Sequence, residues 1–129
     1  MRMLALLLIV ALAKPAWAGE TPWQDVAPGA RARLISSDIL TDGRTMVGLE
    51  LEMAEGINTY WRVPGETGIP TTFDFSASMG IAAHTPLWPY PQIETSTGYV
   101  DFVYRGPTVL PVELTLAGER ADVRLSVHM

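Results

Sequence analysis

Apolar and polar residues alternate along most of this chain with a period of two. The clearest runs are residues 47–53, where Val, Leu, Leu and Met are separated by Gly and Glu, and residues 123–128. Successive side chains of a strand point to opposite faces of a sheet, so this pattern predicts strands with one buried and one solvated face. No long segment carries the 3.6-residue period of a helix.

The alternation and the turn residues between runs predict an all-β chain. We expect strands at residues 32–40, 47–53, 59–63, 71–75, 81–85, 99–104, 109–116 and 121–127. Asp42-Gly43 is a hairpin signal that pairs the first two. Seven or eight short strands without helices are typical of an immunoglobulin-like antiparallel β-sandwich.

The first eighteen residues read as an export signal rather than part of that sandwich. A basic Arg2 precedes an apolar run, and Ala16-Trp17-Ala18 places small residues at the positions a signal peptidase reads. The alternative, a membrane anchor, needs about 20 apolar residues, and this run has about ten. We therefore predict cleavage after Ala18, a domain from residue 19 to 129, and a periplasmic location.

Removal of the signal makes the domain strongly acidic. Arg2 and Lys14 account for two of the nine basic residues, so seven Arg and fourteen acids remain, and 7 minus 14 gives a net charge of −7. Binding to nucleic acid or to anionic membranes is therefore not expected, because both require clustered Lys and Arg. The absence of cysteine means that no disulfide stabilises the fold.

The titratable and nucleophilic residues form no recognisable catalytic or metal-binding pattern. His84 and His128 lie far apart without Cys or helical spacing, which argues against zinc. Residues 64–68 lack the Lys of a phosphate-binding loop, and Ser76 and Ser78 lack a nucleophile elbow. The acids Glu66, Asp74, Glu94 and Asp101 have no spacing that would make a glycosidase pair. We expect no catalytic residue, no metal and no cofactor.

Aromatic residues and prolines gather in two segments, residues 61–75 and 87–94. Their rings could form a platform for a sugar or a peptide, although filling the core of a small sandwich is the favoured interpretation. Pro64-Gly65 predicts a type II turn with a positive φ at the glycine. We therefore expect residues 61–70 to form a shaped loop, a kind of segment that often contacts partners.

Several of these segments, in order, resemble a known family. They are Tyr60-Trp61-Arg62-Val63-Pro64-Gly65-Glu66-Thr67-Gly68-Ile69-Pro70, Phe73-Asp74-Phe75-Ser76, Leu87-Trp88-Pro89-Tyr90-Pro91 and Val109-Leu110-Pro111-Val112. Together they are similar to the N-terminal periplasmic domain of the thiol:disulfide interchange protein DsbD family, in its ScsB-like branch. The positions that match the family pattern are Trp61, Arg62, Pro64, Gly65, Gly68, Pro70, Trp88 and Pro89, which we assign a structural or partner-facing role.

The resemblance implies a protein-disulfide reductase module. In the family, such a domain takes electrons from a membrane-embedded donor domain and passes them to periplasmic thiol proteins, including those of cytochrome c biogenesis or copper resistance. Its Cys-x-x-x-Cys pair follows the strand that residues 125–129 resemble, whereas this sequence contains no cysteine. We therefore expect an N-terminal fragment, incomplete at its C-terminus, that is redox-inactive by itself.

Two alternatives remain open at the level of sequence. One is a stand-alone module that binds a periplasmic protein, in which residues 121–127 form an ordinary edge strand. The other is a carbohydrate-binding module that uses Trp61, Trp88 and Tyr90.

Overall fold

The computed structural model describes residues 3–7, 19–37 and 42–129, and every element in this part of the chain is a β-strand. The strands are β1 (Met3–Leu7), β2 (Gly19–Glu20), β3 (Gln24–Ala27), β4 (Ala30–Ser36), β5 (Arg44–Met53), β6 (Asn58–Gly65), β7 (Thr72–Asp74), β8 (Ile81–Pro86), β9 (Gln92–Glu94), β10 (Asp101–Arg105), β11 (Thr108–Leu116) and β12 (Arg124–His128). No helix in the described ranges is long and apolar enough to cross a membrane.

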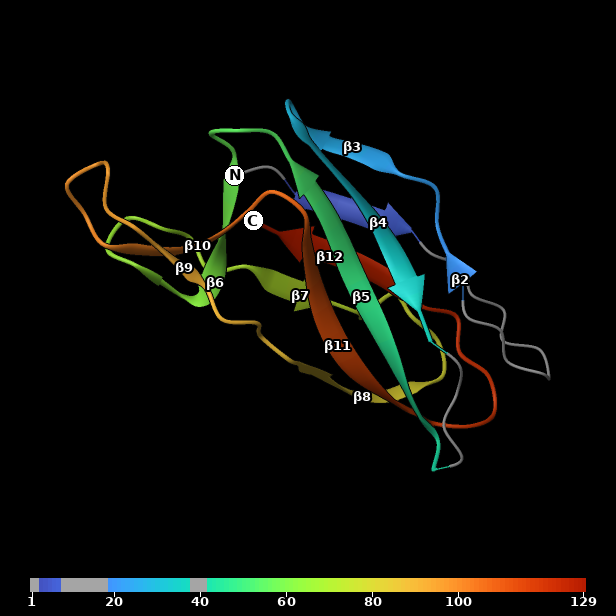
Figure 1. Ribbon diagram of the computed structural model, residues 1–129. Helices are drawn as coiled ribbons and strands as arrows, with labels where there is room; N and C mark the ends of the chain where they lie inside the picture. Colours follow the sequence, from blue (N-terminus) through green and yellow to red (C-terminus); the bar gives the residue numbers. More distant parts are fainter. Residues whose placement is uncertain (1–2, 8–18, 38–41) are drawn as a thin grey trace.

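The strands form three antiparallel sheets. The largest has the order β2-β4-β5-β11-β8, with β3 also paired to β4. A second sheet has the order β1-β12-β7, and a third the order β6-β10-β9. Figure 1 shows β12 and β7 passing behind β5 and β11, while β6, β9 and β10 project to one side. The fold is an immunoglobulin-like β-sandwich, as the strand pattern predicted.

The core begins on the inner face of the largest sheet. Leu49 is paired with Leu34 on one side and with Leu110 on the other, so three leucines lie in one row across β4, β5 and β11. All three are at most 1 % exposed. The alternation in residues 47–53 therefore marks the buried face, as the sequence indicated.

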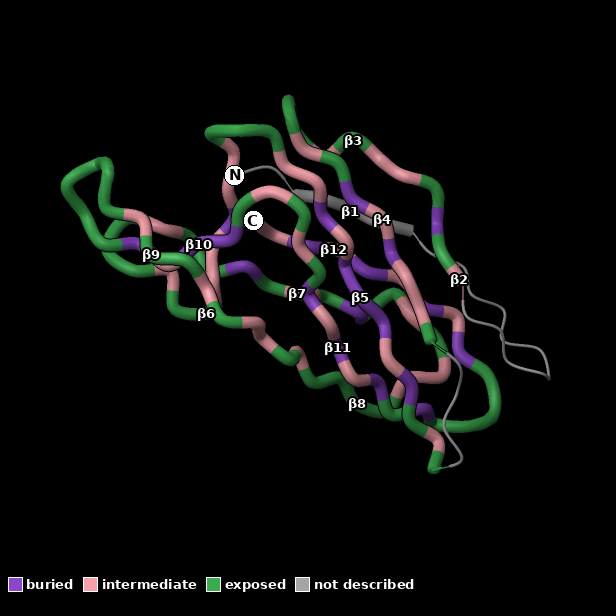
Figure 2. The backbone as a smooth tube through the Cα atoms, in the orientation of Figure 1, coloured by how far each residue is buried: buried purple, intermediate pink, exposed green. Residues whose placement is uncertain are grey.

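The second layer closes this core. Leu125 and Val127 of β12 are buried, as are Phe75, Ala121 and Val123 from the connections beside it. Figure 2 shows the buried positions running along the facing strands, with exposed positions in the turns. Burial of these side chains is the main source of stability for a domain without disulfides.

Residues 3–7 lie beside the last strand. β1 pairs antiparallel with β12, with Met3 opposite His128 and Leu7 opposite Arg124. Residues 8–18, with the predicted cleavage site, lie outside the described residues. Cleavage after Ala18 stays a prediction.

Several boundaries differ from the expected ones. The strand expected at residues 121–127 begins only at Arg124, because Asp122 makes an isolated bridge to Met79 instead. The strand expected to end at residue 40 is described to Ser36, and residues 38–40 are outside the described ranges. Strands β3 and β9, of four and three residues, were not predicted because segments this short carry too little alternation to be recognised.

Candidate functional site

Most residues of the family-like pattern lie in one part of the molecule, which we call the lobe. The lobe consists of β6, β9 and β10 with the connecting segments 66–71, 87–91 and 95–100. In Figure 1 its three strands stand apart from the main sheet. It contains Trp61, Arg62, Pro64, Gly65, Gly68, Pro70, Trp88 and Pro89, all the positions singled out from the sequence.

Strand β6 of the lobe contains a large bulge. Val103 of β10 is opposite Tyr60, but Asp101 is opposite Gly65, so the pairing shifts between these two positions. Pro64 lies within this shift, where its missing N–H interrupts no ladder hydrogen bond. The strand expected at residues 59–63 is confirmed but extends to Gly65, so the loop expected over residues 61–70 begins only after β6 ends.

Close contacts at positions 65 and 68 leave no room for a Cβ. Gly65 has a φ of +92°, and a Cβ there would lie 2.3 Å from the Val100 carbonyl oxygen. A Cβ on Gly68 would lie 2.3 Å from Cδ1 of Tyr60. The positive φ predicted at Gly65 is confirmed, but its place is the end of a bulged strand rather than a free turn.

A buried carboxylate holds the segment after Gly65. Asp101, 4 % exposed, accepts a 2.9 Å hydrogen bond from the Thr67 amide at Oδ1 and a hydrogen bond from the Thr67 hydroxyl at Oδ2. Beside it, the Val100 amide donates to Oε2 of Glu66 at 2.6 Å, and the Glu66 amide donates to the Val100 carbonyl at 3.0 Å. The bonds from Thr67 favour the ionised form and so hold the pKa of Asp101 below its ordinary value.

Replacing this carboxylate should loosen segment 66–71. In Asp101→Asn, one oxygen becomes an NH₂ group and the other becomes a neutral acceptor, so the bond from the Thr67 amide loses its charge-assisted strength and we expect this amide to exchange with solvent about tenfold faster. Because the folded pKa is lowered, the contribution of Asp101 to stability is complete above the ordinary carboxyl pKa and is lost as pH falls through the folded pKa. Amide hydrogen exchange followed by NMR at several pH values measures both effects.

Asp74→Asn is the matched control. Asp74 also accepts a hydrogen bond from a backbone amide, that of Ser76, but it lies outside the lobe on β7. Equal exchange at Thr67 in the Asp101→Asn variant and in the parent protein would show that the carboxylate does not hold the segment.

The aromatic side chains of the pattern pack inward rather than side by side. Trp61 makes an edge-to-face contact with Phe102, with ring centroids 5.8 Å apart, and the guanidinium of Arg62 lies 4.9 Å from the Trp61 ring centre. Trp88 packs on Phe73 with centroids 5.5 Å apart. Both tryptophans contact the main core cluster, which supports core filling over a shared platform.

Large apolar side chains are nevertheless exposed on the lobe. The part of the chain that is described has nine exposed large hydrophobic residues, and seven of them belong to the lobe. These seven are Val63, Ile69, Leu87, Tyr90, Ile93, Tyr99 and Val100. Such a concentration is typical of a surface that contacts a partner. The sequence did not reveal it, because each of these residues could equally have belonged to the core.

The carboxylates considered for glycoside hydrolysis have structural partners. Glu94 forms an ion pair with Arg105, while Asp101, Glu66 and Asp74 hold backbone amides. His84 lies on β8 against Phe75, and His128 lies on β12. Within the described ranges, no group of three or more His, Cys, Asp or Glu residues could hold a metal ion.

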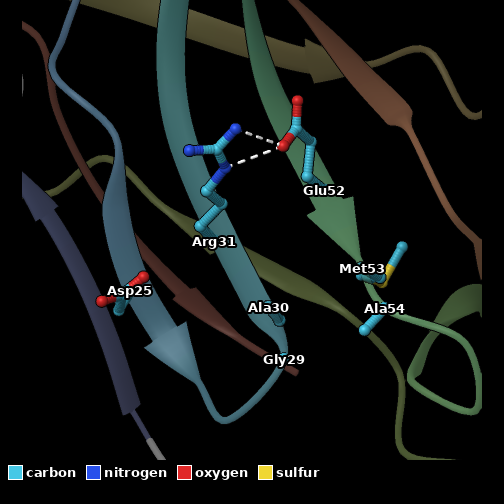
Figure 3. A pocket seen from close by; sticks show the side chains of 7 residues that line it. All are labelled: Asp25, Gly29, Ala30, Arg31, Glu52, Met53 and Ala54. Atoms are coloured by element: carbon cyan, nitrogen blue, oxygen red, sulfur yellow. Dashed lines mark hydrogen bonds and ion pairs between the residues drawn. The ribbon is translucent and has the colours of Figure 1, made fainter.

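A hollow near the β3–β4 edge of the large sheet contains none of the pattern residues. It has a volume of about 350 Å³ and lies between β3, β4 and β5 (Figure 3). The ion pair between Arg31 and Glu52, with Nη2 and Oε2 2.5 Å apart, crosses it, and both side chains are nearly half exposed. Arg31 and Arg33 also lie against the ring of Trp23. Exposed pairs of this kind are common on solvated sheet faces and contribute little to stability.

The comparisons with known proteins agree with the fold and with the family resemblance. The structure defines an immunoglobulin-like β-sandwich domain with a bulged, apolar lobe. Residues 24–129 match the family described as thiol:disulfide interchange protein DsbD, N-terminal. The chain belongs to this family, as the resemblance in its sequence predicted.

A solved structure gives the same result. The crystal structure of the N-terminal periplasmic domain of ScsB from Proteus mirabilis matches with a TM-score of 0.66 and 26 % identity. The match covers 76 % of this chain and 39 % of that one, so the chain spans well under half of the related domain. No curated protein matches.

Proposed function

We propose that this chain is the partner-docking part of a periplasmic protein-disulfide reductase. Membership of the DsbD N-terminal family makes it a thiol-disulfide interchange module. The further step, transfer of reducing equivalents from a membrane donor domain to periplasmic thiol proteins, is our proposal. The proposal includes export, with cleavage after Ala18.

The chemistry of exchange sets the role of these residues. A thiolate attacks one sulfur of a disulfide and forms a mixed disulfide, and a second thiol then releases the reduced partner, so that two electrons and two protons are transferred. The chain contains no cysteine. The reacting sulfurs therefore lie outside these 129 residues, and what the chain contributes is a surface that holds the partner.

The observation that carries this proposal is the apolar surface of the lobe. Most of the exposed large hydrophobic side chains belong to it, and the segment after Gly65 is held in place by Asp101 and by the Val100 backbone. A surface held by buried hydrogen bonds loses little conformational entropy when a partner binds.

Titration of the isotope-labelled chain with exported proteins that carry a reactive Cys-Xaa-Xaa-Cys pair tests the proposal. We expect NMR shift changes at Val63, Ile69, Ile93 and Tyr99, and none in the strands around the Arg31–Glu52 ion pair. Changes on the outer face of β4 and β5 alone, or no changes with either the oxidised or the reduced partner, would contradict it. The carbohydrate alternative predicts that oligosaccharides quench tryptophan fluorescence; we expect unchanged emission, because Trp61 and Trp88 pack against the core.

A further inference from the structure

Tyr90 is presented to solvent in an unusual way. Its side chain is 99 % exposed, the highest value among the large hydrophobic residues that the structure describes. It lies between Pro89 and Pro91, in the connection from β8 to β9. Tyrosines in small sandwiches generally bury most of the ring, so full exposure of this one requires a reason.

The backbone around Tyr90 is fixed on both sides. Before it, the Leu87 amide donates to the Pro111 carbonyl at 2.8 Å, and the Tyr104 hydroxyl donates to the Pro89 carbonyl at 2.8 Å. After it, Gln92 is paired with Val103 in the β9–β10 ladder.

The hydrogen bond from Tyr104 to the Pro89 carbonyl is donated by a buried side chain. Tyr104 is 4 % exposed, and burial raises its pKa to about 12, so its hydroxyl stays a donor throughout the physiological range. The two prolines fix their own φ and restrict the residues before them to extended conformations. The segment is thus a rigid support that holds one aromatic ring away from the protein.

A rigidly held, solvated ring is suited to binding. Exposure of the ring to water is unfavourable, and its insertion into a pocket would bury its apolar area while little backbone entropy is lost. Tyrosine is one of the residue types that dominate binding energy in protein interfaces. Leu87 and Ile93, on either side along the chain, are also exposed and extend the apolar contact.

We propose that Tyr90 is the anchor with which the lobe docks, inserting its ring into an apolar pocket of a thiol-disulfide protein whose rim carries Lys or Arg. This inference rests on the proposed function and deepens it. The basic rim follows from charge, because residues 19–129 contain seven Arg and fourteen acids, a net of −7.

A protein fits this site better than a sugar. A sugar platform formed by Trp61, Trp88 and Tyr90 would need the three rings to be open to solvent together, but Trp61 packs on Phe102 and Trp88 on Phe73. A single ring on a stiff turn, beside aliphatic side chains, matches a protein pocket instead.

Calorimetric titration of the full chain with single, purified exported proteins that carry Cys-Xaa-Xaa-Cys tests this inference. We expect Tyr90→Ala to weaken binding about thirtyfold and Tyr90→Phe, which keeps the ring, only about threefold. Met79→Ala is the matched control, because Met79 is 71 % exposed but lies outside the lobe, and it should bind like the parent protein. Loss of binding in 0.5 M salt would support the basic rim.

The outcomes separate this inference from the proposed function. Parent-like binding by Tyr90→Ala, together with weakened binding by a Val63→Ala, Ile93→Ala double variant, would show that the lobe docks but that Tyr90 is not the anchor. No binding by the unmodified chain would overturn the proposed function and, with it, this inference. Oligosaccharide binding that Tyr90→Ala abolishes would assign the residue to a sugar site instead. Because Tyr90 is fully exposed, its two variants should keep the parent unfolding temperature, and a calorimetric scan of every variant verifies that it is folded.

Discussion

Replacing Gly65 with alanine should lower the free energy of unfolding by about 3 kcal/mol or more. The new Cβ would lie 2.3 Å from the Val100 carbonyl oxygen and 2.6 Å from the Asp101 Cα, both of them backbone atoms that cannot turn aside. The residue would also have to keep a φ of +92°, which is unfavourable for any residue with a Cβ. Urea unfolding of the purified variant, followed by tryptophan fluorescence, measures the loss.

Gly98→Ala separates the two causes of that loss. Gly98 has a similar φ of +86°, but a Cβ there would have no neighbour within 4 Å. We expect this variant to lose only about 1–2 kcal/mol, the cost of the left-handed backbone alone. Equal losses at Gly65 and Gly98 would show that the close approach of β6 to β10 is not what requires glycine.

The second large effect is expected in the core. Leu49→Ala removes the middle side chain of the Leu34–Leu49–Leu110 row and should cost about 2–5 kcal/mol, a large share of the about 5–15 kcal/mol typical of a whole domain. The unfolding midpoint in urea gives this value, provided that the slope of the transition stays unchanged.

Val109→Ala is the matched control in the same sheet. Val109 is opposite Glu50 in the register, on β11, and is 41 % exposed, so its truncation should change stability by less than about 0.5 kcal/mol. A loss at Leu49 no larger than that at Val109 would mean that the two layers do not close over the leucine row.

The local sequence predicts some features of the fold but not others. The pairing of β4 with β5 followed from alternation and from Asp42-Gly43, because both signals are local. The bulge in β6 did not follow, because it depends on where β10 lies relative to Pro64 and Gly65. The strand predicted at residues 59–63 therefore stopped two residues short of the end of β6 at Gly65.

The candidate site shows the same division. Gly65, Gly68 and Pro64 were singled out from the sequence by a family resemblance. The structure gives a steric reason for the two glycines and places Pro64 within the bulge. Asp101 was considered only as a possible catalytic acid, since nothing in the local sequence indicates that its carboxylate reaches Thr67, 34 residues away. The exposure of Tyr90, beside the nearly buried Tyr104, was equally invisible.

By itself, the sequence determined the all-β class, the family and the acidic, cysteine-free character of the chain, because alternation, ordered motifs and composition are properties of the residues alone. Only the tertiary structure decided which aromatic residues are core and which are surface, and which carboxylate holds the lobe. Burial and long-range hydrogen bonds depend on which strands meet, and this is fixed by the packing of the two layers rather than by any segment on its own.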